Sequence, residues 1–333
     1  MAFDPDPFMP AWWCRGPHAQ TLWAAALRPA GAVPVRRERW ETPDGDFLDV
    51  DRLDGVVGSP AVVILHGLEG SSAGSRIRGL LVAAHRLGWR ALALNFRSCS
   101  GEPNRLPRSY HAGDTEDLGW LMDRVAREER RRPVACIGVS LGGNVLVKYL
   151  GERPDGIPEA LKAAVAISTP FDLGASARAF ERGLLNRLYL RRLVRSLKGK
   201  TLAKLRQYPD LVDRTRLAAV RTLAEFDDLV TAPVHGFTGA RHYWSSASCA
   251  PFLPSIRRPL LLINALDDPV VPAGTLPRAM IARHRFVTAA FTRAGGHAGF
   301  IGGSSPAHPL FWAERTAMAF CERQLQGGGL GSQ

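Results

Sequence analysis

The chain alternates short apolar runs with longer amphipathic stretches, and this rhythm constrains its fold more than any other feature. The apolar runs are too short for buried helices and therefore favour strands; they lie at 61–65, 90–95, 134–138, 163–167, 259–264 and 286–291. Between them, stretches such as 78–87 and 141–151 have helical spacing, and Asp114 is placed to cap a further helix. Strands that alternate with helices form parallel sheets covered on both faces. We therefore predict an α/β fold with a mostly parallel central sheet flanked by helices.

The region 171–249 breaks this rhythm. It has helical spacing, few strand-like runs and many arginines. We predict that it is a helical cap inserted over the carboxyl edge of the sheet, within a core formed by residues 35–170 and 250–326. An N-terminal aromatic arm (1–34) precedes the core, and a glycine-rich flexible tail (327–333) follows it.

Charge alone does not identify a partner for this chain. Its 333 residues include 43 Lys and Arg against 31 Asp and Glu, a formal net charge of +12, and only five of the basic residues are Lys. Such a bias toward Arg is typical of genomic base composition. No helix-turn-helix, zinc finger, aromatic RNA platform or basic tail accompanies it, so we expect no nucleic-acid partner.

Cysteine usage and hydropathy favour a cytoplasmic protein. Five widely spaced cysteines without a C-x-x-C pair indicate free thiols in a reducing compartment. No apolar run approaches the roughly 18–20 residues of a membrane span, and no signal peptide is evident. We expect neither a metal nor another cofactor, because no ligand cluster or phosphate-binding loop is present. A further expectation is peripheral contact of the aromatic arm with a membrane surface.

The strongest chemical signal is the segment Gly138–Gly142, which matches G-x-S-x-G directly after a predicted strand and before a predicted helix. This is the setting of a nucleophile elbow, in which a tight turn with small neighbours raises the serine hydroxyl above the sheet edge. We therefore predict Ser140 as a nucleophile and an α/β-hydrolase fold.

A serine hydroxyl needs a base to accept its proton and a carboxylate to orient that base, and in this fold they follow in the order Ser, Asp, His. Asp268 lies just after the predicted strand 259–264, and we favour it over the neighbouring Asp267 as the acid. His297 lies between glycines just past the last strand, and we predict it as the base. Its nearest rival, His308, is expected to enter the terminal helix.

The turn that follows the strand 61–65 can supply an oxyanion hole. We expect the backbone N–H groups of Leu68 and Leu141 to bind the negative oxygen that develops during acyl transfer. Four further residues are expected to line the pocket: His66, Gly67, Glu69 and Asn144. We expect His66 to hold its loop by hydrogen bonds rather than to accept the proton of Ser140.

The sequence resembles the YheT-like branch of the α/β-hydrolase superfamily, also called the AB hydrolase-4 family. The similarity runs from about Pro17 to Leu325. Its matching segments are Pro17–Thr21, Pro43–Phe47, His66–Ser71, Cys99–Arg105, Tyr110–Asp117, Gly138–Asn144, Glu225–Ala232, Asp267–Pro269 and Gly295–Gly303.

This resemblance implies a carboxylic-ester hydrolase with Ser140, Asp268 and His297 as its charge relay. It implies small ester or lipid substrates, among them short-chain esters, monoacylglycerols and phospholipids. One departure is Ser98, which stands where relatives usually carry glycine. Two alternatives remain open: a thioesterase or acyltransferase of the same fold, and a non-catalytic binding or scaffold protein that uses the basic cap. The sequence leaves the oligomeric state open.

Overall fold

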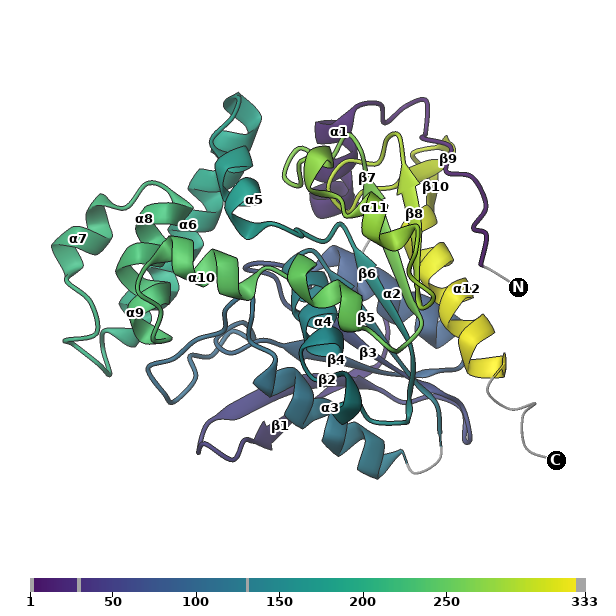
Figure 1. Cartoon of the computed structure of the whole chain (residues 1–333), viewed down its shortest axis with the longest axis horizontal. Helices are drawn as coiled ribbons and strands as arrows, with labels where there is room; N and C mark the ends of the chain where they lie inside the picture. Colours follow the sequence, from purple (N-terminus) through teal and green to yellow (C-terminus); the bar gives the residue numbers. More distant parts are fainter. Residues whose placement is uncertain (1–2, 29–30, 130–131, 328–333) are drawn as a thin grey trace.

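The centre of the molecule is an eight-stranded sheet that helices cover on both faces (Figure 1). The computed structural model describes residues 3–28, 31–129 and 132–327. The strand order is β1-β2-β4-β3-β5-β6-β7-β8, and only the pairs β1–β2 and β2–β4 are antiparallel, which confirms the predicted mostly parallel sheet. The strands are β1 (Val35–Glu41), β2 (Phe47–Leu53), β3 (Ala61–Leu65), β4 (Arg90–Asn95), β5 (Val134–Val139), β6 (Leu161–Ile167), β7 (Leu260–Ala265) and β8 (Val287–Thr292).

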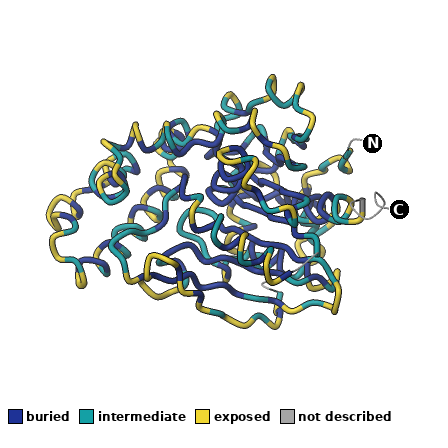
Figure 2. Tube along the Cα trace, turned by 60° about the horizontal axis from the view of Figure 1, so that its bottom comes forward, coloured by how far each residue is buried: buried dark blue, intermediate teal, exposed yellow. Residues whose placement is uncertain are grey.

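Two apolar cores lie on the two faces of this sheet. Successive side chains of a strand point to opposite faces, so Val63 packs in one core and Ile64 in the other. Helices α3 and α4 contribute to the first core, and α2 and α12 to the second. Burial is concentrated along the strands (Figure 2). The helices that flank the sheet are α2 (Ser75–Arg86), α3 (Glu116–Glu128), α4 (Leu141–Glu152), α11 (Arg278–Ile281) and α12 (Trp312–Gly327).

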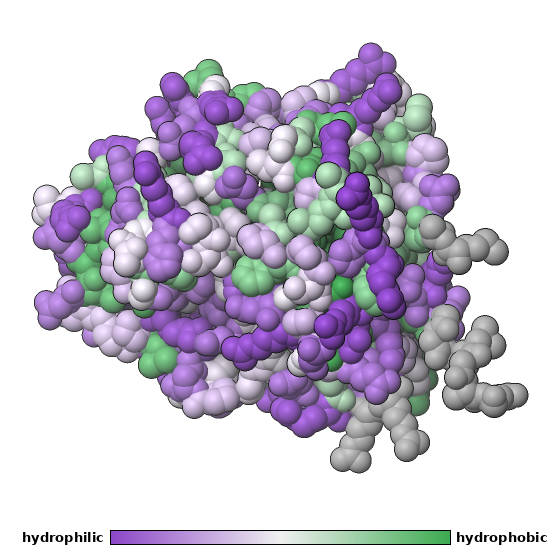
Figure 3. Space-filling model, in the orientation of Figure 1, coloured by the Kyte–Doolittle hydropathy of each residue, from purple (hydrophilic) through white to green (hydrophobic). Residues whose placement is uncertain are grey.

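A run of helices between β6 and β7 occupies the region predicted as an insertion, and we call residues 171–249 the cap segment. Its helices have an apolar cluster of their own and gather on one side of the sheet (Figure 1). In the same view the surface is mostly hydrophilic, with hydrophobic patches over the cap segment and near the middle (Figure 3). Its elements are α5 (Leu173–Phe180), α6 (Leu184–Lys204), α7 (Arg214–Ala219), α8 (Leu223–Phe226), η3 (Asp227–Thr231), α9 (Ala232–Val234) and α10 (Ala240–Ala247), followed by η4 (Ala250–Ser255).

The aromatic arm packs onto the core near the C-terminal elements. It contains α1 (Pro17–Leu22) and a π-helical turn, η1 (Trp23–Leu27). The Trp13 and Trp23 rings lie 5.2 Å apart, and Trp23 also contacts Phe311. The arm is therefore part of the folded unit, although the side chain of Trp12 remains exposed.

Three local predictions were wrong. Asp114 does not cap a helix: α3 follows Thr115, and the Asp114 carboxylate instead accepts from Arg108 at 3.2 Å. His308 is not in the terminal helix but in β10 (His308–Phe311), which pairs with β9 (Ile301–Ser305) in a hairpin before α12. The helix predicted from residue 78 begins one turn earlier, at Ser75.

Of the predicted tail, only Gly327 lies within the described residues, as the last residue of α12. The five cysteines are free and buried, in agreement with the predicted thiols. Among the described residues, no helix combines the length and the apolar character that crossing a bilayer requires.

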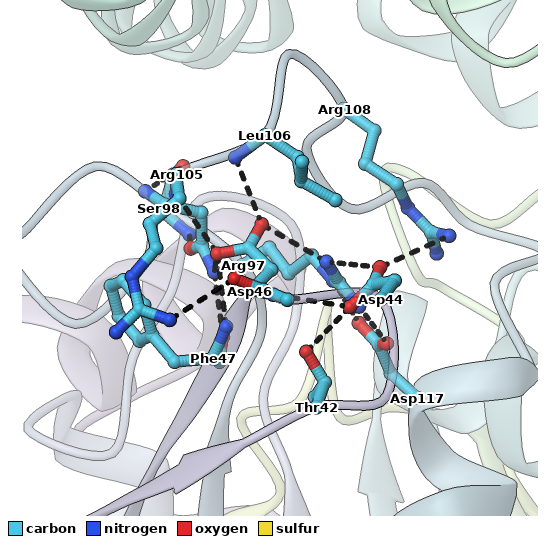
Figure 4. Close-up of polar contacts among 12 residues, drawn as sticks. Thr42, Asp44, Asp46, Phe47, Arg97, Ser98, Arg105, Leu106, Arg108 and Asp117 are labelled. Carbon is cyan, nitrogen blue, oxygen red and sulfur yellow. Dashed lines mark hydrogen bonds and ion pairs between the residues drawn. The ribbon is translucent and has the colours of Figure 1, made fainter.

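A buried ionic cluster joins the β1–β2 turn, the loop after β4 and the start of α3 (Figure 4). The Arg97 guanidinium is 2% exposed; it contacts Asp117 through two hydrogen bonds of 2.7 Å and Asp46 at 3.0 Å. Asp46 also accepts from the side-chain amide of Asn104 at 3.0 Å and from the backbone N–H of Arg105 at 2.9 Å. Burial of these charges is tolerated because each carboxylate faces the guanidinium or an N–H group. The cluster therefore holds the loop 97–109 in one position.

Replacing Arg97 with Met tests this cluster. The substitution leaves the carboxylates of Asp46 and Asp117 buried without their cation, so we expect the free energy of unfolding in urea to fall by about 3–5 kcal/mol. The matched control is Arg257→Met, which breaks a pair with Asp155 whose side chains are 60% and 82% exposed; it should cost less than about 1 kcal/mol. Equal losses in the two variants would contradict a structural role for the cluster.

Candidate active site

Ser140 occupies a strained turn between β5 and α4. Its backbone lies in the left-handed half of conformational space, at φ 55° and ψ −118°. A Cβ at Gly138 would lie 2.3 Å from the carbonyl oxygen of Gly142, and a Cβ at Gly142 would lie 2.6 Å from that of His66. Only glycine fits at these two positions, so the motif is required by sterics. The turn places the hydroxyl at the carboxyl end of β5 and the amino end of α4.

The three residues predicted as a charge relay form a chain in which His297 lies within hydrogen-bond distance of both Ser140 and Asp268. His297 Nε2 is 2.9 Å from Ser140 Oγ, and His297 Nδ1 is 2.9 Å from Asp268 Oδ2. The other carboxylate oxygen of Asp268 accepts from the backbone N–H groups of Val270 and Val271 at 2.8 and 3.0 Å. Because β5, β6, β7 and β8 are parallel neighbours, their carboxyl ends bring these loops to one edge of the sheet.

The neighbouring acid has a different partner. Asp267 accepts from the backbone N–H of Gly296 at 2.9 Å and has no contact with the imidazole ring. Burial raises the pKa of Asp267. The geometry thus brings Asp268 to His297, while Asp267 supports the backbone of the loop that carries His297. The rival His308 bonds instead to Ser305, in the β9–β10 hairpin.

The turn after β3 lies directly against Ser140. A Cβ at Gly67 would lie 3.1 Å from the Cβ of Ser140. Among the described residues, the backbone N–H groups of Leu68 and Leu141 have no acceptor, which suits donors that await a negative oxygen.

His66 holds this turn by hydrogen bonds. Its Nε2 accepts from the backbone N–H of Phe96 at 3.1 Å, so Nδ1 carries the proton and donates to the carbonyl oxygen of Gly67 at 2.8 Å. Burial lowers the pKa of His66 to about 4, so the ring is neutral near neutral pH. With both nitrogens engaged, it has no free site for the proton of Ser140.

Glu69 joins the same turn to the cap segment. Its side chain is buried, although its backbone has a positive φ of 56°. The hydroxyl of Tyr110 donates to the carboxylate at 2.9 Å and accepts from the Glu69 backbone N–H at 2.8 Å. Lys200 and Ser196, both on α6, also donate to this carboxylate, the first at 3.0 Å. Movement of α6 would therefore disturb the turn that carries Leu68.

Ser140 and His297 open into a cavity between the sheet edge and the cap segment. Much of its wall is apolar and comes from the cap segment, including Leu173, Phe180, Leu211, Leu223, Phe226 and Val230. Polar groups also line it: Glu69, Ser98, Ser109, Lys200, Thr201 and Lys204. The loop held by the ionic cluster of Figure 4 supplies Ser98, Pro107 and Ser109 to this wall.

Of the four residues predicted to line the pocket, Glu69 is part of the cavity wall, whereas His66, Gly67 and Asn144 are not among its lining residues. Asn144 is fully buried, where its side-chain amide donates to Ala112 and Ala247 carbonyl oxygens at 2.7 and 2.8 Å and accepts from the Cys249 N–H at 3.0 Å. These contacts fasten α4 to the loop before α3 and to the end of the cap segment.

Sequence reasoning missed the residues that hold the His297 loop. Thr21 and Arg76 both bond to the backbone of His297, yet the motif Pro17–Thr21 carried no assigned role. A matching segment so far from the triad was the available signal. Ser98 has a φ of 62°, a conformation that favours the glycine that relatives usually carry at this position.

Comparisons with known proteins agree with this fold. A family profile described as an alpha/beta hydrolase fold matches residues 60–301. The chain is 38% identical over 302 residues to "Putative esterase YheT" of Escherichia coli (strain K12), covering 89% of this chain and 87% of that protein. It is 31% identical over 276 residues to "Monoacylglycerol lipase" of Saccharomyces cerevisiae, covering 80% of this chain and 59% of that protein.

Among solved structures, the esterase Pf2001 of Pyrococcus furiosus superposes with a TM-score of 0.53 at 16% identity and covers 97% of each chain. At this identity the likeness concerns the fold alone.

His66 makes stability depend on pH. Folded, it binds a proton only near pH 4, whereas the unfolded chain does so near 6.5. The unfolded state binds more protons between these values, so the free energy of unfolding should fall as the pH drops from about 6.5 to about 4, by up to about 1.4 kcal/mol per pH unit for this group. His66→Gln removes the titration. Urea unfolding across this pH range should give a shallower slope for the variant, and parallel curves would contradict the neutral His66.

Proposed function

Because this chain belongs to the α/β-hydrolase fold family, among whose members are esterases and lipases, we propose that it hydrolyses carboxylic esters through Ser140, His297 and Asp268. The observation that carries the proposal is the continuous chain of 2.9 Å contacts from the Ser140 hydroxyl through the imidazole to a buried carboxylate. Such a chain gives a hydroxyl the base that it lacks on its own.

In the proposed reaction, Ser140 Oγ attacks the ester carbonyl carbon while His297 Nε2 takes the hydroxyl proton. The carbonyl oxygen becomes negative, and the N–H groups of Leu68 and Leu141 bind it, each worth about 2.7–4 kcal/mol of transition-state stabilisation. The C–O bond to the leaving alcohol breaks as His297 returns the proton to that alcohol. Water, deprotonated by His297, then releases the acid from Ser140. Asp268 keeps the proton on Nδ1 and stabilises the charged imidazolium.

The cavity supports an ester with an apolar acyl chain. Its apolar wall from the cap segment can bury such a chain, while Ser109 and Lys200 offer polar contacts for the remainder of the molecule. We therefore propose short-chain esters or monoacylglycerol-like lipids as substrates. Both place one carbonyl at Ser140 and need no cofactor.

Three substitutions test the relay. Ser140→Ala should abolish hydrolysis of 4-nitrophenyl esters and covalent labelling by a fluorophosphonate. Asp268→Asn should lower kcat by about 10³- to 10⁴-fold, because the amide no longer favours the proton on Nδ1. Asp267→Asn, the same change one residue away, should cost far less, since an amide oxygen can still accept from Gly296.

Equal losses in Asp267→Asn and Asp268→Asn would contradict the assignment of the acid. Failure of folded wild-type protein to react with any fluorophosphonate would favour the binding or scaffold alternative. Faster transfer to an added alcohol than to water would favour an acyltransferase, and preference for thioesters a thioesterase.

Narrowing the cavity tests where the acyl chain lies. Val230 is buried in the cavity wall, so Val230→Trp should lower kcat/KM for octanoyl esters about tenfold or more and leave acetyl esters within about threefold. Val57→Trp, at a side chain that is 94% exposed, is the control and should change neither. An equal loss of kcat/KM on acetyl and octanoyl esters would show that the acyl chain lies elsewhere.

Peripheral contact with a membrane is the remaining part of the proposal. Large hydrophobic side chains are exposed on the arm and at the start of α6, namely Met9, Trp12, Leu184 and Leu188. The neighbouring Arg191, Arg192 and Arg195 have no carboxylate partner among the described residues, so they suit anionic headgroups. Repeating the octanoyl assay with anionic vesicles should raise the rate if this contact forms, and an unchanged rate would count against it.

A further inference from the structure

The loop that carries His297 has an unfavourable backbone. Gly296, Ala298 and Phe300 have φ values of 58°, 52° and 47°, so three of five consecutive residues lie in the left-handed region. For residues other than glycine this region costs of order 1–3 kcal/mol each and persists only where the surroundings hold it. The position of the imidazole therefore depends on whatever grips this loop.

Thr21, on α1, grips the loop at His297 itself. Its hydroxyl accepts from the backbone N–H of His297 at 2.9 Å and donates to the Pro17 carbonyl oxygen at 2.7 Å. The hydroxyl is thus oriented by its own helix and presents a lone pair to the loop. A Cβ at Gly296 would lie 2.3 Å from the Pro17 carbonyl oxygen, so the arm and the loop are in direct backbone contact.

Gln20 grips the same loop at its far end. Its side-chain oxygen accepts from the N–H of Ile301 at 2.5 Å, and its amide donates to the carbonyl oxygens of Ile301 and Cys14 at 3.0 and 2.7 Å. The side chain is 1% exposed, so neither Ile301 group has water as an alternative partner.

Arg76, on α2, closes the arrangement from behind. Its half-buried guanidinium donates to the carbonyl oxygens of His297 at 3.1 Å, Ala298 at 2.9 Å and Thr21 at 3.1 Å. It therefore bonds to the arm and to the loop at once, so the two cannot separate without breaking the hydrogen bonds of a half-buried charged group.

We propose that Thr21, Gln20 and Arg76 are positioning residues for His297, and that the motif Pro17–Thr21 is a clamp that holds the imidazole loop for catalysis. The inference rests on the proposed hydrolase function. The clamp acts on the transition state through His297 and contributes no atom to the substrate cavity. Its loss should therefore lower kcat and leave KM nearly unchanged.

The test compares Thr21→Val with Thr21→Ser. Valine keeps the shape but removes the acceptor of the His297 N–H, so kcat and the rate of fluorophosphonate labelling should fall about tenfold or more, with KM within about twofold. Serine restores the acceptor and should return kcat to within about threefold of wild type. Thr275→Val is the matched control, since its hydroxyl also donates to a proline carbonyl, at 2.7 Å, and accepts nothing from the loop; it should keep wild-type kcat.

A folded Thr21→Val with wild-type kcat overturns the clamp, as does a loss that appears in KM instead or that serine does not reverse. Should Thr21→Val fail to fold, Arg76→Lys serves, because it keeps the charge but replaces the planar fork of donors by a single nitrogen. It should lower kcat at constant KM, and unchanged kcat overturns the proposal. The clamp is tested under conditions in which wild-type protein hydrolyses the ester and Ser140→Ala does not. An inactive wild type would count against the proposed function and not against the clamp.

Discussion

The tight turn at Ser140 is the constraint on which the rest of the site depends. Ser140, the proposed nucleophile, rises above the sheet because its backbone has a positive φ and because Gly138 and Gly142 leave no side chain in the way. The same close approach brings the turn of His66 and Gly67 against the nucleophile, where the free N–H groups of Leu68 and Leu141 can face one oxygen. One steric requirement thus positions both the proposed nucleophile and the proposed oxyanion hole.

Around this turn, the molecule uses buried polar contacts to hold loops that sheet pairing does not reach. Arg97 and its carboxylates hold the loop 97–109 of the cavity wall. Glu69 ties the turn after β3 to α6, and Thr21 ties the arm to the loop of His297. Each contact is costly to bury and so demands a partner, which restricts each loop to one arrangement. Precise placement of the reacting groups follows from this restriction.

Sequence reasoning succeeded where structure is set locally. The strands from 90 to 95 and 61 to 65 have the predicted bounds, because a short apolar run is recognisable from the sequence alone. It failed where a side chain had a choice of partners. The Asp114 side chain accepts a hydrogen bond from Arg108 rather than capping the helix after it. The Asn144 side chain bonds to buried backbone groups, among them the N–H of Cys249. It also missed the antiparallel strands β1 and β2 and the β9–β10 hairpin, whose residues lack the continuous apolar pattern of the predicted strands.

The sequence by itself determined the α/β architecture and the residue types at the sheet edge, because hydrophobic periodicity and the sterics of a glycine-flanked serine act within a few residues. Only the tertiary structure decided that Asp268 rather than Asp267 meets His297, and that Thr21 holds the loop of a histidine 276 positions later. Such choices depend on distances of a few ångströms between segments far apart in the chain. Those distances exist only after the sheet, the cap segment and the arm have packed together.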